Sequence, residues 1–201
     1  MRAWMRGLAA RMHALERPRA PEPLPATIGR RRVYVLPTPF GLFYAALVVA
    51  MVLGALNYNN NPALLLALLL GAAGLASLIA THLQLSGLRV DAVSAEPVAA
   101  GEDLWLRLSV SCRDGRRRRG LRADLGGAHD RASLGEDGRG ELVLAVPTHR
   151  RGWLEPGRIR LSTTQPLGLA RGWSRVWPRQ PLLVYPRAEA AVPPLPENGG
   201  Q

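Results

Sequence analysis

Two long apolar runs, residues 40–56 and 63–85, dominate the first half of the sequence. Only the polar stretch 57–62 separates them, and neither run contains Asp, Glu, Lys or Arg. At a rise of about 1.5 Å per residue the first run covers roughly 25 Å and the second more, against a hydrocarbon core of about 30 Å. Residues 64–70 read Leu-Leu-Leu-Ala-Leu-Leu-Leu, which leaves no polar face for a soluble helix pair. The pattern predicts a two-helix transmembrane hairpin at residues 40–85, with a buried hairpin in a soluble protein as the alternative.

From residue 88 onward, apolar positions alternate with polar ones instead of recurring at helical spacing. In residues 104–111, every second position from Leu104 to Val110 is apolar, which is a strand signature. Further short strands are predicted at residues 88–93, 120–125, 140–147, 158–163, 169–177 and 181–185, with Gly and Pro turn signals between them. Many short strands without a helical pattern predict an all-β, immunoglobulin-like antiparallel sandwich after the hairpin.

These patterns divide the chain into four parts. Residues 1–39 are expected to form a basic cytoplasmic lead, with a short amphipathic helix or a frayed tail at 3–15 and a Pro-rich linker after it. The transmembrane hairpin follows, and residues 86–187 are expected to form a cytoplasmic β-sandwich domain. Residues 188–201 are rich in Pro and Gly without periodicity, so we expect a disordered tail there.

The distribution of charge predicts the orientation of the hairpin in the membrane. The chain carries 26 basic and 15 acidic residues, a net charge of +11. Eight arginines precede the first apolar run, whereas the connection at 57–62 has no charge. By the positive-inside rule the N-terminus is cytoplasmic, and two spans return the chain to the same side. For a membrane-spanning protein of this charge, anionic membrane lipids are the nearest partner.

Two arginine clusters are the candidate contact residues. They are Arg30, Arg31, Arg32, Arg116, Arg117, Arg118 and Arg119. The first cluster is predicted to be a cytoplasmic charge stop beside the first span. The second is predicted to touch anionic headgroups or an acidic partner, the alternative being a solvated hairpin tip that opposes edge-to-edge association of sheets. Nucleic acid is not an expected partner, because no aromatic residue is interleaved with these arginines.

The residue types that carry most enzyme chemistry are few and scattered. None of the four histidines lies in a recognisable motif with a nucleophile and an orienting group. Cys112 is the single cysteine, which excludes an internal disulfide. Gly126-Gly127 lacks the Gly-Lys-Ser/Thr ending of a phosphate-binding loop. We therefore expect a non-enzymatic protein without a catalytic, cofactor or metal site.

The order of three short motifs carries a family resemblance. They are Arg-Arg-Gly at 150–152, Thr-Thr-Gln-Pro-Leu-Gly-Leu at 163–169 and Val-Tyr-Pro-Arg at 184–187. Together with the two spans, this order resembles the bacterial membrane family called domain of unknown function 58, over about residues 30–187. The family's glycine-aspartate-x-x-arginine segment normally follows the tyrosine-proline piece and does not occur here, so the resemblance also implies a truncated product.

The resemblance implies a place at the bacterial inner (plasma) membrane, since family members are commonly encoded beside MoxR-type AAA ATPases and transglutaminase-like membrane proteins. With the spans and the strands, it predicts a non-enzymatic, membrane-anchored protein that presents a cytoplasmic β-sandwich to another protein of an ATPase-linked assembly system. Two alternatives stand beside it. One is a membrane surface module that binds anionic lipid, and the other is a truncated fragment without independent function.

Overall fold

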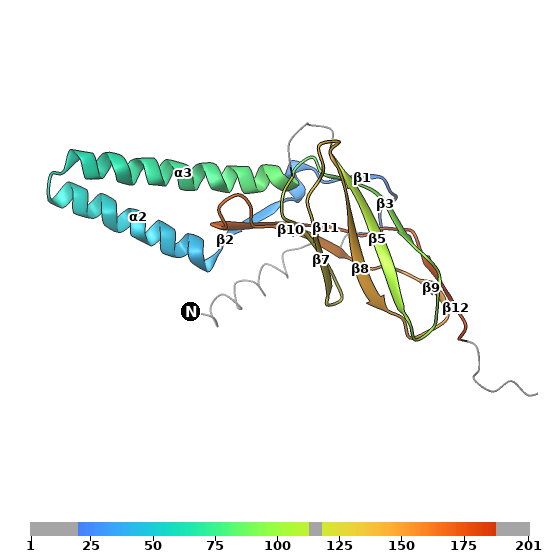
Figure 1. Cartoon of the computed structure of the whole chain (residues 1–201). Coiled ribbons are helices and arrows are strands. Elements are labelled where there is room, and N and C mark those ends of the chain that lie inside the picture. Colours follow the sequence, from blue (N-terminus) through green and yellow to red (C-terminus); the bar gives the residue numbers. More distant parts are fainter. Residues whose placement is uncertain (1–19, 113–117, 188–201) are drawn as a thin grey trace, which may run out of the picture.

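Two long helices lead into a β-rich domain in the computed structural model, which describes residues 20–112 and 118–187 (Figure 1). The helices are α2 (Pro39–Asn57) and α3 (Asn61–Leu85), antiparallel and joined by a short turn. Each begins with a side-chain cap and a proline in the first turn: Thr38 accepts from the N–H of Gly41 at 3.0 Å, and Asn60 accepts from the N–H of Ala63 at 3.1 Å. The predicted pair of long apolar helices joined by a short turn is therefore confirmed.

Both helices are long and apolar enough to cross a membrane. Only 11% of the most apolar 18-residue window of each helix is buried inside the molecule. Large side chains such as Phe43 and Leu65 are 66% and 70% exposed. A helix pair in the core of a soluble protein would bury these groups, because exposed apolar area costs about 25 cal/mol per Å² in water.

Small residues let the two helices approach each other. A Cβ on Gly74 would lie 3.0 Å from the ring of Tyr44, and one on Gly71 would lie 3.6 Å from Val48. The hydroxyl of Tyr44 donates to the carbonyl oxygen of Leu70 at 2.7 Å. Small residues and an interhelical hydrogen bond are the usual means of helix association in lipid.

The β-domain contains three sheets. Their strands are β1 (Ala26–Thr27), β2 (Tyr34–Pro37), β3 (Arg89–Ala95), β4 (Val98–Ala99), β5 (Asp103–Ser111), β6 (Leu121–Leu125), β7 (Ala128–Ala132), β8 (Arg139–Pro147), β9 (Gly152–Leu154), β10 (Ile159–Thr163), β11 (Ala170–Val176) and β12 (Leu182–Tyr185). The strand orders are β1-β3-β5-β8, β2-β11-β10-β6-β7 and β4-β12-β9. All named pairings are antiparallel except that of β4 with β12.

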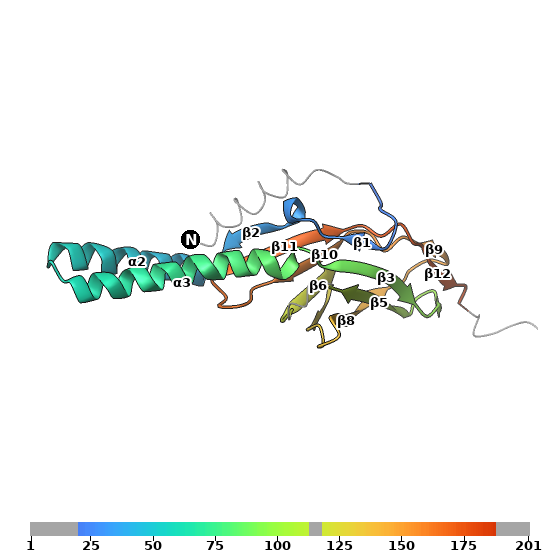
Figure 2. The ribbon, with the colours of Figure 1, turned by 90° about the horizontal axis from the view of Figure 1, so that it is seen from above.

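The four-stranded and five-stranded sheets share one apolar core (Figure 2). In β5 the alternating residues from Leu104 to Val110 are buried, as the period-two pattern predicts. From the other sheet, Leu121 of β6 and Ile159 of β10 are fully buried in the same cluster. The prediction of two long apolar helices followed by a mostly antiparallel, sandwich-like β-domain is thus confirmed.

The Pro-rich stretch before the first helix is not a linker, which corrects the boundaries expected for residues 1–39 and 86–187. β1 pairs with β3, placing Ala26 opposite Val90, and β2 pairs with β11 from Tyr34 to Pro37. Both are edge strands, where a proline costs no ladder hydrogen bond. Residues 20–37 therefore belong to the β-domain. The helix expected at 3–15 and the tail expected at 188–201 lie outside the described residues.

As a result, both ends of the hairpin enter the same domain. β2 runs directly into α2, and the last turns of α3 pack on β10 and β11 before the chain continues into β3. Thr81 and Leu85 of α3 are fully buried, and a Cβ on Gly172 of β11 would lie 3.2 Å from the Cγ2 of Thr81. The second helix is thus partly an element of the β-domain core.

Candidate functional site

Helices and β-domain meet in a set of contacts that we name the helix collar: Thr38, Gly41, Thr81, Arg118 and the loop of residues 164–169. Thr38 lies at the start of α2, where its hydroxyl donates to the carbonyl oxygen of Gly168 at 2.6 Å. Its backbone N–H donates to the carbonyl oxygen of Leu169 at 2.9 Å. A Cβ on Gly41 would lie 1.9 Å from that same oxygen, so only glycine allows this approach.

The α3 side of the collar holds the other end of the loop. The hydroxyl of Thr81 lies 2.9 Å from the carbonyl oxygen of Gln165. The loop that carries the Thr-Thr-Gln-Pro-Leu-Gly-Leu motif therefore contacts α2 through Gly168 and Leu169, and α3 through Gln165. This motif has a structural role in the molecule, because it joins the β-domain to both helices.

Arg118 is buried, contrary to the expectation that it touches headgroups or a partner. Its side chain is 1% exposed, and its guanidinium donates to the carbonyl oxygens of Leu83 and Ser86. These carbonyls belong to the last turn of α3, where no intrahelical donor remains. A cation here also offsets the partial negative charge of the helix C-terminus. The pattern of four consecutive arginines gives no sign of this role, since it predicts a solvated tip.

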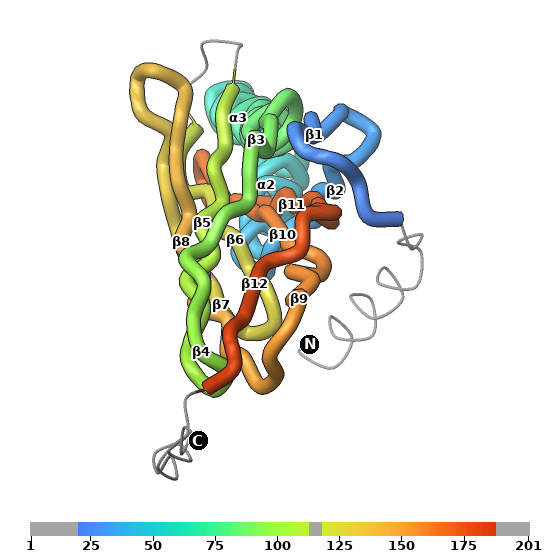
Figure 3. The backbone as a smooth tube through the Cα atoms, turned by 90° about the vertical axis from the view of Figure 1, so that its right-hand side faces the viewer, coloured from blue at the N-terminus to red at the C-terminus, as the bar shows by residue number. Residues whose placement is uncertain are grey.

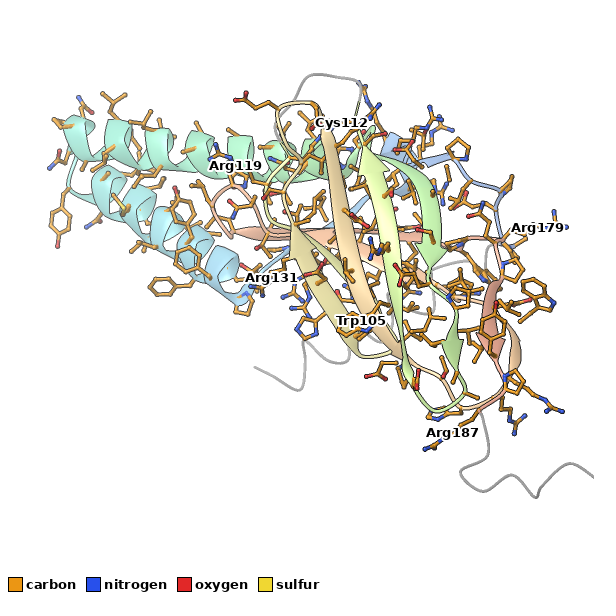
Figure 4. The ribbon with its side chains drawn as sticks, turned by 45° about the vertical axis from the view of Figure 1, so that its right-hand side comes forward. Trp105, Cys112, Arg119, Arg131, Arg179 and Arg187 are labelled. Carbon is orange, nitrogen blue, oxygen red and sulfur yellow. The ribbon has the colours of Figure 1, made fainter. Side chains whose placement is uncertain are left out.

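The other predicted contact residues differ in their exposure. Arg119 is exposed, and Figure 4 shows it on the side of the β-domain next to the helices. Arg30 and Arg31 are also exposed, in a 3-10 turn, η1 (Arg30–Arg32). Arg32 forms a bidentate salt bridge with Glu22, with 2.9 Å between Nη1 and Oε2. It also donates to the carbonyl oxygen of Arg175. Arg116 and Arg117 lie outside the described residues.

The first arginine cluster does not lie immediately beside the span. The residues from Val33 to Pro37, mostly strand β2, separate Arg32 from the cap of α2. Five extended residues cover about 16 Å at about 3.3 Å each. The structure does not bring the two arginine clusters together into one contact surface.

The end of the β-domain far from the helices exposes aromatic side chains, and Figure 3 looks onto this end with the helices behind it. Trp153 on β9 is 71% exposed and Tyr185 on β12 is 51% exposed. In the strand register Trp153 lies opposite Leu183, which is partly exposed. We name Trp153, Leu183 and Tyr185 the far patch. Isolated apolar groups at a surface are ordinary, whereas exposed aromatic residues on two paired strands, β9 and β12, are typical of a binding surface.

Two motifs that are distant in the sequence meet at the far patch. Gly152, the last residue of the Arg-Arg-Gly motif, pairs with Val184 of the Val-Tyr-Pro-Arg motif. Arg150, Arg151 and Arg187 are exposed at the same motifs. Of the three motifs that carry the resemblance, one therefore lies in the helix collar and two lie side by side at the far end.

Comparisons with family models, with curated proteins and with solved structures found no match to this chain. Within residues 20–112 and 118–187, no three His, Cys, Asp or Glu side chains lie close enough to hold a metal ion. The functional argument below therefore rests on the geometry of the chain and on the sequence resemblance.

Proposed function

We propose that this protein is a non-enzymatic protein of the bacterial inner membrane that holds a β-domain at the cytoplasmic face and presents the far patch to a protein partner. The observation that carries the proposal is that the two ends of the β-domain differ: one is attached to the helices, and the other is exposed. The helix collar fixes the domain to the helices, whereas Trp153 and Tyr185 are exposed at the opposite end.

The proposed topology is supported by the sheet pairing. The strand before α2 and the strand after α3 belong to one β-domain, so a hairpin that crosses the bilayer leaves both on the same side. The arginine excess before the first helix favours the cytoplasmic side. We also retain the immunoglobulin-like arrangement of the sandwich as part of the proposal, supported by two facing antiparallel sheets of short strands with a common core.

The partner we propose is a MoxR-type AAA ATPase, with a transglutaminase-like membrane protein as a further member of the same assembly. This choice comes from the family resemblance. The chemistry of the far patch is compatible with a protein partner, because Trp, Tyr and Arg are the residue types most enriched where binding energy is concentrated.

The test is a binding measurement between the detergent-solubilised full chain and a purified MoxR-type ATPase from the same bacterium. We expect binding by the wild type and a loss of about tenfold or more in Trp153→Ala, because truncating a central aromatic residue of an interface costs about 2 kcal/mol or more. Trp105→Ala is the matched control, since Trp105 is 57% exposed on β5 of a different sheet.

Equal binding by the Trp153→Ala and Trp105→Ala variants would contradict the assignment of the far patch. Absence of binding by the wild type would contradict the proposed partner. Alkaline extraction of membranes tests the remaining part of the proposal, since a spanning hairpin keeps the chain in the membrane pellet.

A further inference from the structure

An arginine-lined groove lies on the outer face of the five-stranded sheet. It encloses about 580 Å³ and is lined from strands β6, β7, β10 and β11 and from the loop at residues 164–165. The inward-facing residues of these strands, such as Leu121 and Leu161, belong to the core, and the alternate positions face the groove. Among them are Arg122 and Arg160.

The lining of this groove carries an excess of positive charge. It is lined by the four arginines Arg122, Arg131, Arg160 and Arg171. Asp124 is the one acidic residue of the lining, and it is bonded to Arg122 at 2.8 Å. Three positive charges therefore remain in excess. Clustered like charges oppose folding unless an anion compensates them, so an arginine-rich hollow is a natural anion site.

Two of these arginines are available to a ligand. Arg131 and Arg171 are exposed, and neither guanidinium has a hydrogen-bond or ion-pair partner among the described residues. The hydroxyls of Ser162 and Thr164 add neutral donors to the same lining. Planar guanidinium groups bind phosphate oxygens through two parallel N–H bonds, which makes phosphate the anion best matched to this set.

A hollow on the opposite sheet shows that this charge excess is a local property. That hollow encloses about 810 Å³ and is lined by Arg89 and Arg139, but also by three acidic residues, Asp91, Asp137 and Glu141. Its charges nearly balance. The groove on the five-stranded sheet therefore differs from an ordinary charged surface of this arginine-rich protein.

The position of the groove indicates the source of the phosphate. Its lining ends at Thr164 and Gln165, in the loop of the helix collar. Leu167, at the tip of this loop, is 55% exposed, and Phe40 in the first turn of α2 is 58% exposed. Figure 4 shows Arg131 toward the helices and Arg187 at the far end. If the helices cross a bilayer, the apolar loop tip meets its surface and the groove opens within reach of the headgroups.

We propose that this groove binds the phosphodiester headgroup of an anionic phospholipid. Arg131 and Arg171 hold the phosphate oxygens, and the bound headgroup fixes the orientation of the β-domain against the membrane surface. The inference rests on the membrane insertion proposed above and does not depend on the partner at the far patch. In this proposal, the lipid is recognised by the four arginines of the groove, which lie far apart in the sequence. The consecutive arginines at 116–119 have no part in it.

The test measures lipid retention by the purified full chain in a neutral detergent. Equal amounts of phosphatidylglycerol and phosphatidylcholine are supplied, and bound lipid is counted by native mass spectrometry. We expect the wild type to retain phosphatidylglycerol preferentially. The double variant Arg131→Gln/Arg171→Gln should lose this preference by about tenfold or more, because hydrogen bonds to charged groups are removed at two positions. The control is Arg107→Gln/Arg139→Gln, which removes two exposed arginines from the outer face of the opposite sheet.

Three outcomes would overturn the proposal: equal retention of both lipids, an unchanged preference in the Arg131→Gln/Arg171→Gln variant, or an equal loss in the control variant. Competition with excess inorganic phosphate identifies the source. Phosphatidylglycerol that resists displacement supports a lipid site, and complete displacement by free phosphate overturns it. Alkaline extraction of the wild type keeps this result separate from the proposed function, since a chain that stays in the membrane without lipid preference refutes the groove alone.

Discussion

At the helix end of the β-domain, Thr38, Thr81 and Arg118 turn inward and bond backbone carbonyl oxygens, whereas at the far end Trp153 and Tyr185 are exposed to solvent. Thr81 and Arg118 are thus buried at one end of the domain, and two aromatic residues are exposed at the other. This is the reverse of the usual preference, in which arginine is rarely fully buried and large aromatic residues are mostly covered.

The difference has a physical cause at the helix end. α3 ends inside the protein, where Leu85 is fully buried and Ser86 is 8% exposed, so the last carbonyls of the helix have no access to water. Buried carbonyls need donors, and Arg118 supplies them. No such demand explains the exposure of Trp153. The exposure of Trp153 and Tyr185 meets no such requirement of the fold, and it supports the binding that we propose at the far end.

Among the variants of the helix collar, Arg118→Ala should have the largest effect on folding. This change removes the donors to two carbonyls of the last turn of α3 and leaves a cavity in a buried site. We expect a loss of about 3 kcal/mol in the free energy of unfolding, since each unsatisfied buried acceptor costs about 1–3 kcal/mol. Thermal unfolding in detergent, followed by circular dichroism, measures it. Arg119→Ala is the neighbouring control and should change stability by less than about 0.5 kcal/mol, because Arg119 is exposed. Equal effects of the two variants would refute the capping role.

Gly41→Ala should be next in size. The added methyl would lie 1.9 Å from the carbonyl oxygen of Leu169, so α2 must move away from the loop. Overpacking of this kind costs about 1–3 kcal/mol, which outweighs the gain of about 0.5–1 kcal/mol from replacing a helical glycine. Gly54→Ala is the matched control in the same helix, because no atom lies within 4 Å of its Cβ position. We expect the melting temperature to fall in Gly41→Ala and not to fall in Gly54→Ala. A melting temperature unchanged in both variants would contradict the close approach of Gly41 to Leu169.

Thr81→Val should have a smaller effect. It keeps the shape of the side chain and removes the hydrogen bond to Gln165, at a cost of about 1 kcal/mol. Hydrogen exchange of the amides in residues 164–169 should become faster, since the loop loses its attachment to α3. Thr164→Val, at an exposed position of the same loop, should leave the exchange unchanged. If both variants exchange like the wild type, the loop is held by other contacts.

Trp153→Ala should have the smallest effect on stability, within about 0.5 kcal/mol, although it is expected to abolish most partner binding. Trp173→Ala provides the contrast. Trp173 is only 7% exposed and its ring stacks on Tyr34 at 5.9 Å between centroids, so its loss should cost about 3 kcal/mol or more. Both values come from thermal unfolding. A strongly destabilised Trp153→Ala variant would mean that the far patch belongs to the fold and is not an open binding surface.

Local patterns in the sequence were sufficient for the elements with strong periodicity. The apolar runs at 40–56 and 63–85 correspond to α2 at Pro39–Asn57 and α3 at Asn61–Leu85. The alternation at 104–111 corresponds to β5 at Asp103–Ser111. Such segments can be recognised because their burial pattern repeats at the period of the helix or the strand.

Short strands without such a pattern were missed. β7 (Ala128–Ala132) and β9 (Gly152–Leu154) were not among the predicted strands, and β1 and β2 fell within the expected linker. β1 has two residues and is a strand only because β3 lies beside it. β1, β2 and β9 form because strands far away in the sequence pair with them. β-propensity depends on such neighbours, which a local stretch of sequence does not contain.

By itself, the sequence determined that the chain has two long apolar helices, a β-rich domain after them and a strong excess of arginine. Only the tertiary structure decided what the arginines do: Arg118 closes the end of α3, Arg32 binds Glu22, and Arg131 lines a groove with Arg171. The physical reason is that hydrophobic periodicity is a local property of the chain. The partner of a charged side chain depends on which strands and helices the fold brings beside it.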